Sequence, residues 1–202
     1  MNRVLLSLTC LGFALCLSAA TAAETTTAGN LKAAHQASLD AKARYEAFAA
    51  RAAEEGYKSA AALFRAAARS EDIHVAKYAA ALKDAGVEAR AEAAKPEVKT
   101  TKENVEAAIK AKTDAKDAVL PGCVKQAEAD KQKKAAMFFK GAIASDGEYV
   151  KLLGEARDNL DGWRAGDKEF LVCTVCSYVM TDSNVKQCPI CAAPREKFES
   201  FK

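Results

Sequence analysis

Four cysteines near the C-terminus have the spacing of a metal site. They form two C-x-x-C pairs, Cys173 with Cys176 and Cys188 with Cys191, separated by eleven residues. Each pair can place two thiolates on one tetrahedral ion. Two disulfides are the alternative, which an oxidising compartment favours, but a bridge inside one C-x-x-C turn is strained. The spacing therefore predicts a mononuclear four-thiolate site, and it does not separate iron from zinc.

The first residues have the pattern of an export signal. A short positive segment (1–3) precedes an almost entirely apolar run (4–17) and then a small-x-small motif at 20–22. The apolar run is too short for a stable membrane span, so cleavage near Ala22 or Ala23 leaves no span behind. We therefore expect residues 1–23 to be removed and the protein to be periplasmic or extracellular. An uncleaved anchor is the alternative.

The chain from there to residue 160 is helical in composition and pattern. Alanine dominates, and the whole sequence has only 4 prolines. Apolar positions recur at helical spacing, which predicts helices over about 30–55, 59–85, 103–129 and 131–160. Pro121-Gly122 should kink or break the third helix. The polar stretch 86–101 is too long for a simple turn and indicates a crossover connection.

Charge excludes one class of partner. The chain has 30 basic and 27 acidic residues, a net charge of +3. Because binding to the phosphate backbone needs a strongly basic face, nucleic acid is not expected as a partner.

The two helical hairpins look like copies of one another. The segment 64–75 matches 139–150 at an offset of 75, and 30–34 matches 104–108 at an offset of 74. The longer pair shares a Ser-acid-x-x-ring-Val pattern. Alanine-rich helices show some similarity by chance, but this pattern favours duplication. We therefore predict a four-helix bundle with a long middle connection.

The bundle and the cysteine tail together resemble the rubrerythrin family. The tail reads Cys-x-x-Cys-Ser177-Tyr178, then Cys-Pro-x-Cys-x-x-Pro194, then Phe198, with Ser177 where the family usually has glycine. The resemblance implies a mainly α chain: a ferritin-like bundle (24–160), a linker (161–169) and a small rubredoxin-like metal-bound β/loop domain (170–202). It also implies that one iron, held by the four thiolates, shuttles one electron. Zinc remains the alternative.

The resemblance further implies a diiron centre in the bundle, which in the family reduces hydrogen peroxide, but most ligand positions are altered. Three of the expected ligands remain: Glu71, His74 and Asp146. Other types occupy the remaining positions: Ser38, Lys112, Ala115 and Tyr149.

Lys112 is the most informative of these departures. Its helical stripe includes Val105, Ala108 and Ile109, so the ammonium should point into the bundle. There it can pair with Glu71 or Asp146 and replace the positive charge of a metal. We therefore expect no diiron centre. A single metal on Glu71, His74 and Asp146, and a surface pair of Glu71 with His74, are the alternatives.

A few other residues carry smaller predictions. His35 is a displaced ligand or, as we expect, a solvated side chain. Cys123 is a buried filler or pairs with another chain. Asp114 and Asp117 should lie on the exposed side. The core should contain five aromatic residues: Tyr45, Phe48, Phe64, Phe138 and Phe139.

The expected function is that of an exported, iron-binding redox protein. It would pass one electron through the four-thiolate iron to a redox partner protein, and it would form a homodimer as rubrerythrins commonly do. Two alternatives stay open. One is a peroxide-reducing enzyme with an altered diiron or single-metal site. The other is a structural or binding protein that a zinc ion staples.

Overall fold

The computed structural model describes residues 26–202. The predicted export signal, its cleavage site and the uncleaved-anchor alternative all fall outside these residues. No helix in the described part is both long and apolar enough to span a bilayer.

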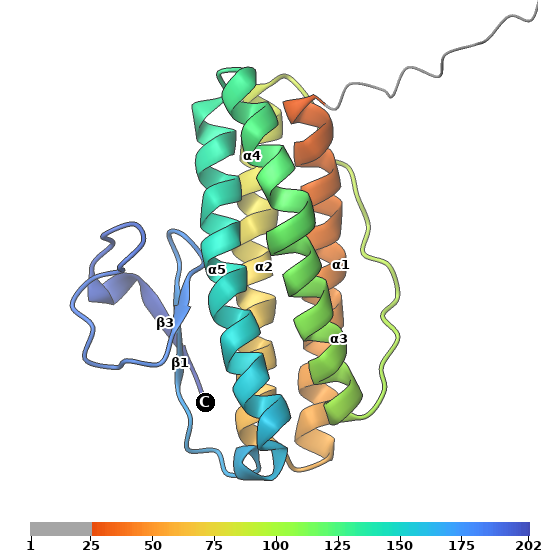
Figure 1. Cartoon of the computed structure of the whole chain (residues 1–202), viewed down its shortest axis with the longest axis vertical. Coiled ribbons are helices and arrows are strands. Elements are labelled where there is room, and N and C mark those ends of the chain that lie inside the picture. The colour runs from red at the N-terminus through yellow and green to blue at the C-terminus, as the bar shows by residue number, and fades with distance from the viewer. Residues whose placement is uncertain (1–25) are drawn as a thin grey trace, which may run out of the picture.

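The helices form an elongated bundle (Figure 1). Helices α1 (Thr27–Glu54) and α2 (Lys58–Asp84) make the first hairpin. In the second, α3 (Thr101–Asp114) and α4 (Leu120–Ala129) together act as one long helix that returns through α5 (Lys133–Asp158). The predicted fold class, a ferritin-like four-helix bundle followed by a small metal-binding β/loop region, is confirmed.

Local signals set the ends of these helices. The Thr26 hydroxyl accepts a hydrogen bond from the Gly29 amide and caps α1. Thr100 and Glu103 form a reciprocal capping box at α3. Gly56, at φ 80°, ends the first helix in the left-handed conformation that glycine adopts without steric cost.

The third helix is interrupted earlier than the sequence predicts. A π-helical turn, Ala115–Val119, joins α3 to α4, and Pro121 stands in the first turn of α4. Proline has no N–H, and its ring crowds the carbonyl four residues before it. The hydrogen-bond ladder therefore widens on the N-terminal side of Pro121.

The crossover covers part of α1. Residues 85–100 run in an irregular path along the outside of the bundle (Figure 1). The Gln36 side chain donates to the Glu92 carbonyl at 2.8 Å, and the Ala94 amide donates to Asp40 at 2.8 Å. His35 lies beneath this segment and is only 7% exposed. The expectation that His35 is solvated is therefore wrong, because the long connection removes this face from water.

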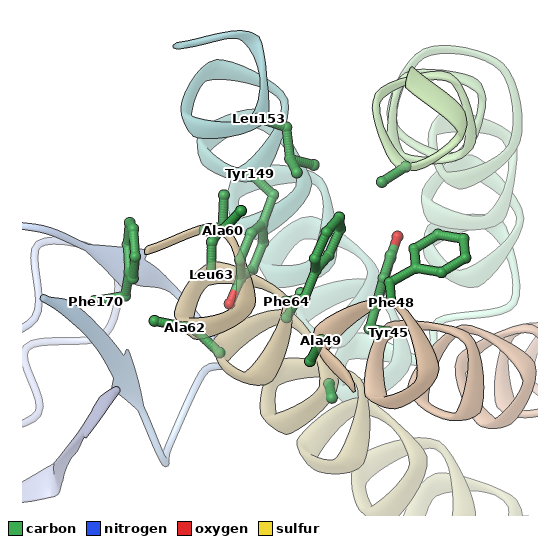
Figure 2. Close-up of a cluster of buried hydrophobic side chains, with 14 of the residues drawn as sticks. Tyr45, Phe48, Ala49, Ala60, Ala62, Leu63, Phe64, Tyr149, Leu153 and Phe170 are labelled. Carbon is green, nitrogen blue, oxygen red and sulfur yellow. The ribbon is translucent and has the colours of Figure 1, made fainter. Parts of the chain in front are cut away.

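One hydrophobic core runs from α1 through α2 to the C-terminal strands. Tyr45 and Phe64 stack with ring centroids 6.2 Å apart, and Phe48 meets Phe64 edge-on at 5.4 Å. Figure 2 shows Phe64 and Phe170 on opposite sides of the small residues of α2. Four of the five aromatic residues predicted for the core are buried, and the fifth, Phe138, is half-buried. Small alanine side chains let these elements approach closely.

The C-terminal region is a small antiparallel sheet against α2 and α5 (Figure 1). Strand β1 (Phe170–Cys173) lies between β2 (Val179–Met180) and β3 (Phe198–Phe201). Trp163 stacks on Phe170 at 5.8 Å. The guanidinium of Arg69 on α2 donates to both carboxylate oxygens of Glu199 on β3, at 2.7 and 2.9 Å. The sheet is thus joined to the bundle by a shared hydrophobic core and by a bidentate ion pair.

Candidate metal centre and buried ion cluster

The four predicted cysteine ligands come together in the C-terminal region. Their sulfur atoms all lie within 4.8 Å of one another, and all four thiols are free. Cys173 and Cys191 are 3.7 Å apart, and Cys176 and Cys188 are 3.4 Å apart. A tetrahedral ion with metal–sulfur bonds of about 2.3 Å needs sulfur–sulfur distances of about 3.8 Å. The arrangement fits one four-thiolate metal ion and not two disulfides.

Two similar turns hold the sulfurs in place. The Ser177 amide donates to the Cys173 carbonyl at 2.8 Å, and the Ala192 amide donates to the Cys188 carbonyl at 2.9 Å. Ser177 (φ 71°) and Ala192 (φ 57°) are both left-handed, a conformation that costs a non-glycine residue about 1 kcal/mol or more. A hydrogen bond from the Cys176 thiol lowers the pKa of Cys173 to about 5. A ligand thiolate is therefore available at neutral pH.

The first cysteine turn is bound directly to the bundle through Ser177. Its carbonyl oxygen accepts hydrogen bonds from the hydroxyls of Ser70 on α2 and Ser145 on α5, each at 2.9 Å. These two serines are equivalent positions of the repeat. The Tyr149 hydroxyl lies 2.8 Å from Ser70 Oγ and donates to it, since the serine proton points to Ser177. Ser177 Oγ also lies 2.6 Å from His74 Nε2.

A buried ion cluster lies on the other side of His74. The Lys112 ammonium donates to Glu71 Oε1 at 2.7 Å and to Asp146 Oδ1 at 2.6 Å. The other oxygen of Glu71 accepts from Ser38 Oγ at 2.8 Å and lies 3.2 Å from His74 Nδ1. Each of these five side chains is buried. The Lys112 ammonium also lies 5.0 Å from the centre of the Tyr149 ring, within the range of cation–π attraction.

Burial disfavours the charged form of each group in the cluster. The ion pairs offset this effect fully for Lys112 and Glu71 but only in part for Asp146. Burial acts to lower the pKa of Lys112, but Asp146 and Glu71 raise it well above its ordinary value. Burial acts to raise the pKa of Glu71, and Lys112 and His74 bring it below its ordinary value. For Asp146 burial prevails and the pKa is raised, although Lys112 offsets part of the effect. Lys112 is thus protonated and Glu71 ionised at neutral pH.

These bundle residues do not fit a pair of iron ions as they lie. The ammonium of Lys112 takes oxygen atoms of Glu71 and Asp146 that a metal would need, and both ring nitrogens of His74 have partners. Within residues 26–202, the group suited to a metal ion is the four cysteines alone. The same contacts leave the single-metal alternative at Glu71, His74 and Asp146 without a vacant set of ligand atoms.

The remaining candidate residues lie outside both sites. Cys123 is 7% exposed, and burial raises the pKa of its thiol, which makes it unreactive. Asp114 and Asp117 are exposed, and His35 lies under the crossover. Sequence reasoning missed the role of Ser70, Ser145 and Ser177. Two signals pointed to it: the serine that both repeats share, and the serine that replaces the family's usual glycine.

Comparisons with known proteins agree with both parts of the fold. The family model described as Rubrerythrin matches residues 29–147, and the model described as the rubrerythrin rubredoxin-like domain matches 172–199. Nigerythrin from Nitratidesulfovibrio vulgaris is 29% identical over 174 residues, which cover 85% of each chain. Rubrerythrin-2 from Clostridium acetobutylicum is 27% identical over 177 residues, covering 87% of this chain and 96% of its own. The solved structure of fully reduced, all-ferrous nigerythrin superposes with a TM-score of 0.80 at 27% identity and covers 91% of each chain.

Proposed function

Because the chain belongs to the rubrerythrin family of iron-binding redox proteins, we propose that it is an exported one-electron carrier. Its redox centre is a single iron held by four residues: Cys173, Cys176, Cys188 and Cys191. The bundle holds no diiron centre and serves as the scaffold that positions the iron-binding loops.

The observation that carries this proposal is the position of Lys112. Its ammonium lies 2.7 Å from Glu71 and 2.6 Å from Asp146, inside the bundle. Two iron ions bring at least four positive charges, and the two carboxylates already share one cation. A buried ion pair of this kind is tolerated only when its partners are all present, so the lysine and a metal compete for the same oxygen atoms.

The chain's own residues prepare the four-thiolate site for electron transfer. When bound, the iron supplies a one-electron change between its ferric and ferrous states. Backbone amides of Val175 and Cys176 donate toward Cys173 and stabilise negative charge on its sulfur. The hydrogen bonds of Ser177 to α2 and α5 fix the turn that carries Cys176. A rigid site of this kind changes oxidation state with little rearrangement.

Iron is favoured over zinc by the family and by its relatives. The superposed nigerythrin structure is described as all ferrous, and the rubredoxin-like family model covers all four cysteines of this chain. Export is supported by the charge and hydropathy pattern of residues 1–23. In this proposal the redox partner and a second copy of the chain meet the protein outside the cytoplasm.

Metal analysis combined with a visible spectrum of the purified protein tests the proposal. We expect one iron per chain and a red colour that bleaches on reduction. Three irons per chain would overturn the proposed metal-free bundle, and a colourless zinc protein would overturn electron transfer. In Lys112→Glu the competing cation is gone, so we expect more than one metal ion per chain.

The second candidate function is peroxide reduction at the bundle. A cavity of about 480 Å³ beside Glu71 and His74 favours it, because Tyr45 also lines this cavity and its hydroxyl has no hydrogen-bond partner among the described residues. Peroxide turnover with a reductant, compared between the natural protein and Glu71→Ala, separates the two functions. Equal rates remove the bundle from the chemistry, whereas loss of turnover in the variant supports the enzyme.

A further inference from the structure

A broad hollow of about 940 Å³ lies where the turn between α4 and α5 meets the cysteine loops. Its lining includes three large apolar side chains that remain exposed: Met137 (61%), Val175 (45%) and Ile190 (46%). Only five large apolar side chains in the described part of the chain are exposed to this degree, and three of them gather here. Such a cluster is typical of a surface that another molecule covers.

The hollow also contains the exposed edge of the metal centre. Cys191 lines it and is the one cysteine of the four that is exposed, whereas Cys173, Cys176 and Cys188 are buried. Val175 and Ile190 stand inside the two C-x-x-C pairs and flank this edge. Because electron transfer weakens steeply with distance, a partner seated in the hollow would have the shortest route to the iron.

The rim of the hollow is basic. Four lysines line it: Lys77, Lys131, Lys133 and Lys140. Glu128 is the only acidic residue among the lining residues. Lys140 pairs with Glu128 at 2.6 Å. Lys77, Lys131 and Lys133 have no acidic side chain within ion-pair distance anywhere in residues 26–202. The chain as a whole has a net charge of only +3, whereas the lining of this hollow alone has four lysines against one glutamate.

We propose that this hollow is the docking surface for an acidic electron-transfer protein. The inference rests on the proposed function and names the chemistry of the partner. Carboxylates on the partner face Lys131 and Lys133, and an apolar patch on the partner covers Met137, Val175 and Ile190. One electron passes in the complex: a reduced partner loses it, and ferric iron becomes ferrous. No bond is made or broken. Charge complementarity of this kind raises the rate of association more than the affinity.

A second copy of this chain is the rival occupant. A two-fold axis through the hollow would set the two basic rims face to face, and the unpaired lysines would repel one another. The charge of the hollow therefore disfavours a dimer in which the two hollows meet, and it favours a partner that presents carboxylates.

Stopped-flow reduction of the ferric holoprotein by a reduced acidic flavodoxin tests the proposal. We expect the second-order rate constant to fall as salt is added. Lys131→Glu/Lys133→Glu should lower it by about tenfold at low salt. The matched control, Lys95→Glu/Lys102→Glu, makes the same change in net charge at two exposed residues away from the hollow. It should lower the rate constant much less. Met137→Ser should slow the reaction, whereas Val98→Ser, at a residue of similar character on the crossover, should not.

Three outcomes would overturn the docking surface. Equal slowing by the two charge-reversed proteins would show that only net charge matters. A rate constant independent of salt would show that the rim takes no part. A homodimer that Lys131→Glu/Lys133→Glu dissociates in sedimentation would assign the hollow to a second copy. Reversible reduction of the same protein by a small dye serves as a separate check, because its failure would contradict the proposed electron transfer itself.

Discussion

Ser177 Oγ lies 2.6 Å from His74 Nε2, so the residue that follows Cys176 is bonded to the buried ion cluster of the bundle. His74 is the histidine that the family resemblance assigns to a diiron site. Here its two nitrogens connect Glu71 with the loop of the four-thiolate site. The side chain has become a structural link between the two halves of the molecule.

Two substitutions at Ser177 should separate this hydrogen bond from backbone strain. Ser177→Ala removes the hydroxyl but keeps a Cβ at φ 71°, so the free energy of unfolding should fall by about 1–3 kcal/mol. Ser177→Gly also loses the hydroxyl but regains about 1 kcal/mol, because glycine adopts this conformation freely. Urea unfolding of the iron-loaded proteins measures the difference. Equal losses in the two variants would show that the left-handed backbone adds no strain here.

Lys112→Met should be strongly destabilising. It leaves the carboxylates of Glu71 and Asp146 buried without a cation, which typically costs 3–5 kcal/mol. Lys110→Met is the matched control, because Lys110 lies on the same helix, is 76% exposed and pairs with Asp114 at the surface. Its loss should change the free energy of unfolding by less than about 0.5 kcal/mol. A similar small effect for both variants would contradict the interior ion pair.

Acid should weaken the protein through Glu71. Its folded-state pKa is below the ordinary value of 4.5, so the unfolded chain takes up a proton first as pH falls. The stabilisation by Glu71 is complete above pH 4.5 and should decline by about 1.4 kcal/mol per pH unit below it. Asp146 acts in the opposite sense, because its folded-state pKa is raised above 3.8. Unfolding curves of the natural protein and Glu71→Gln should therefore converge as pH falls. A constant gap between them would refute this linkage.

The two kinds of cysteine should respond differently to substitution. Cys191→Ser removes one of four thiolates, so the visible thiolate-to-iron bands should change and the metal should be lost more readily to a chelator. Cys123→Ser should leave the spectrum and the metal content unchanged, because Cys123 lies among apolar residues of α4 and its neighbours. A changed spectrum in Cys123→Ser would place this thiol near the metal centre.

Most of the fold and the four ligands of the metal centre could be predicted from short-range patterns in the sequence. Helical periodicity located the helices, and the two C-x-x-C pairs located the four sulfurs, because both patterns encode contacts between residues close in the chain. The inward stripe of α3 also indicated the orientation of Lys112. Spacing could not show that Ser177 meets His74, since 103 residues separate them. The burial of His35 was likewise hidden, because it depends on where the crossover lies.

The convergence of Ser70 and Ser145 on the Ser177 carbonyl has a consequence for symmetry. Both hydroxyls reach the same oxygen at 2.9 Å, one from each of the two helical hairpins. Two equivalent serine donors would accept the cysteine loop equally well in either of two orientations on the face formed by α2 and α5. That choice falls to the ring position four residues after each serine, where one half offers the imidazole of His74 and the other the phenol of Tyr149. The difference between His74 and Tyr149 thus favours a single orientation of the docked loop, because only His74 contacts the Ser177 hydroxyl.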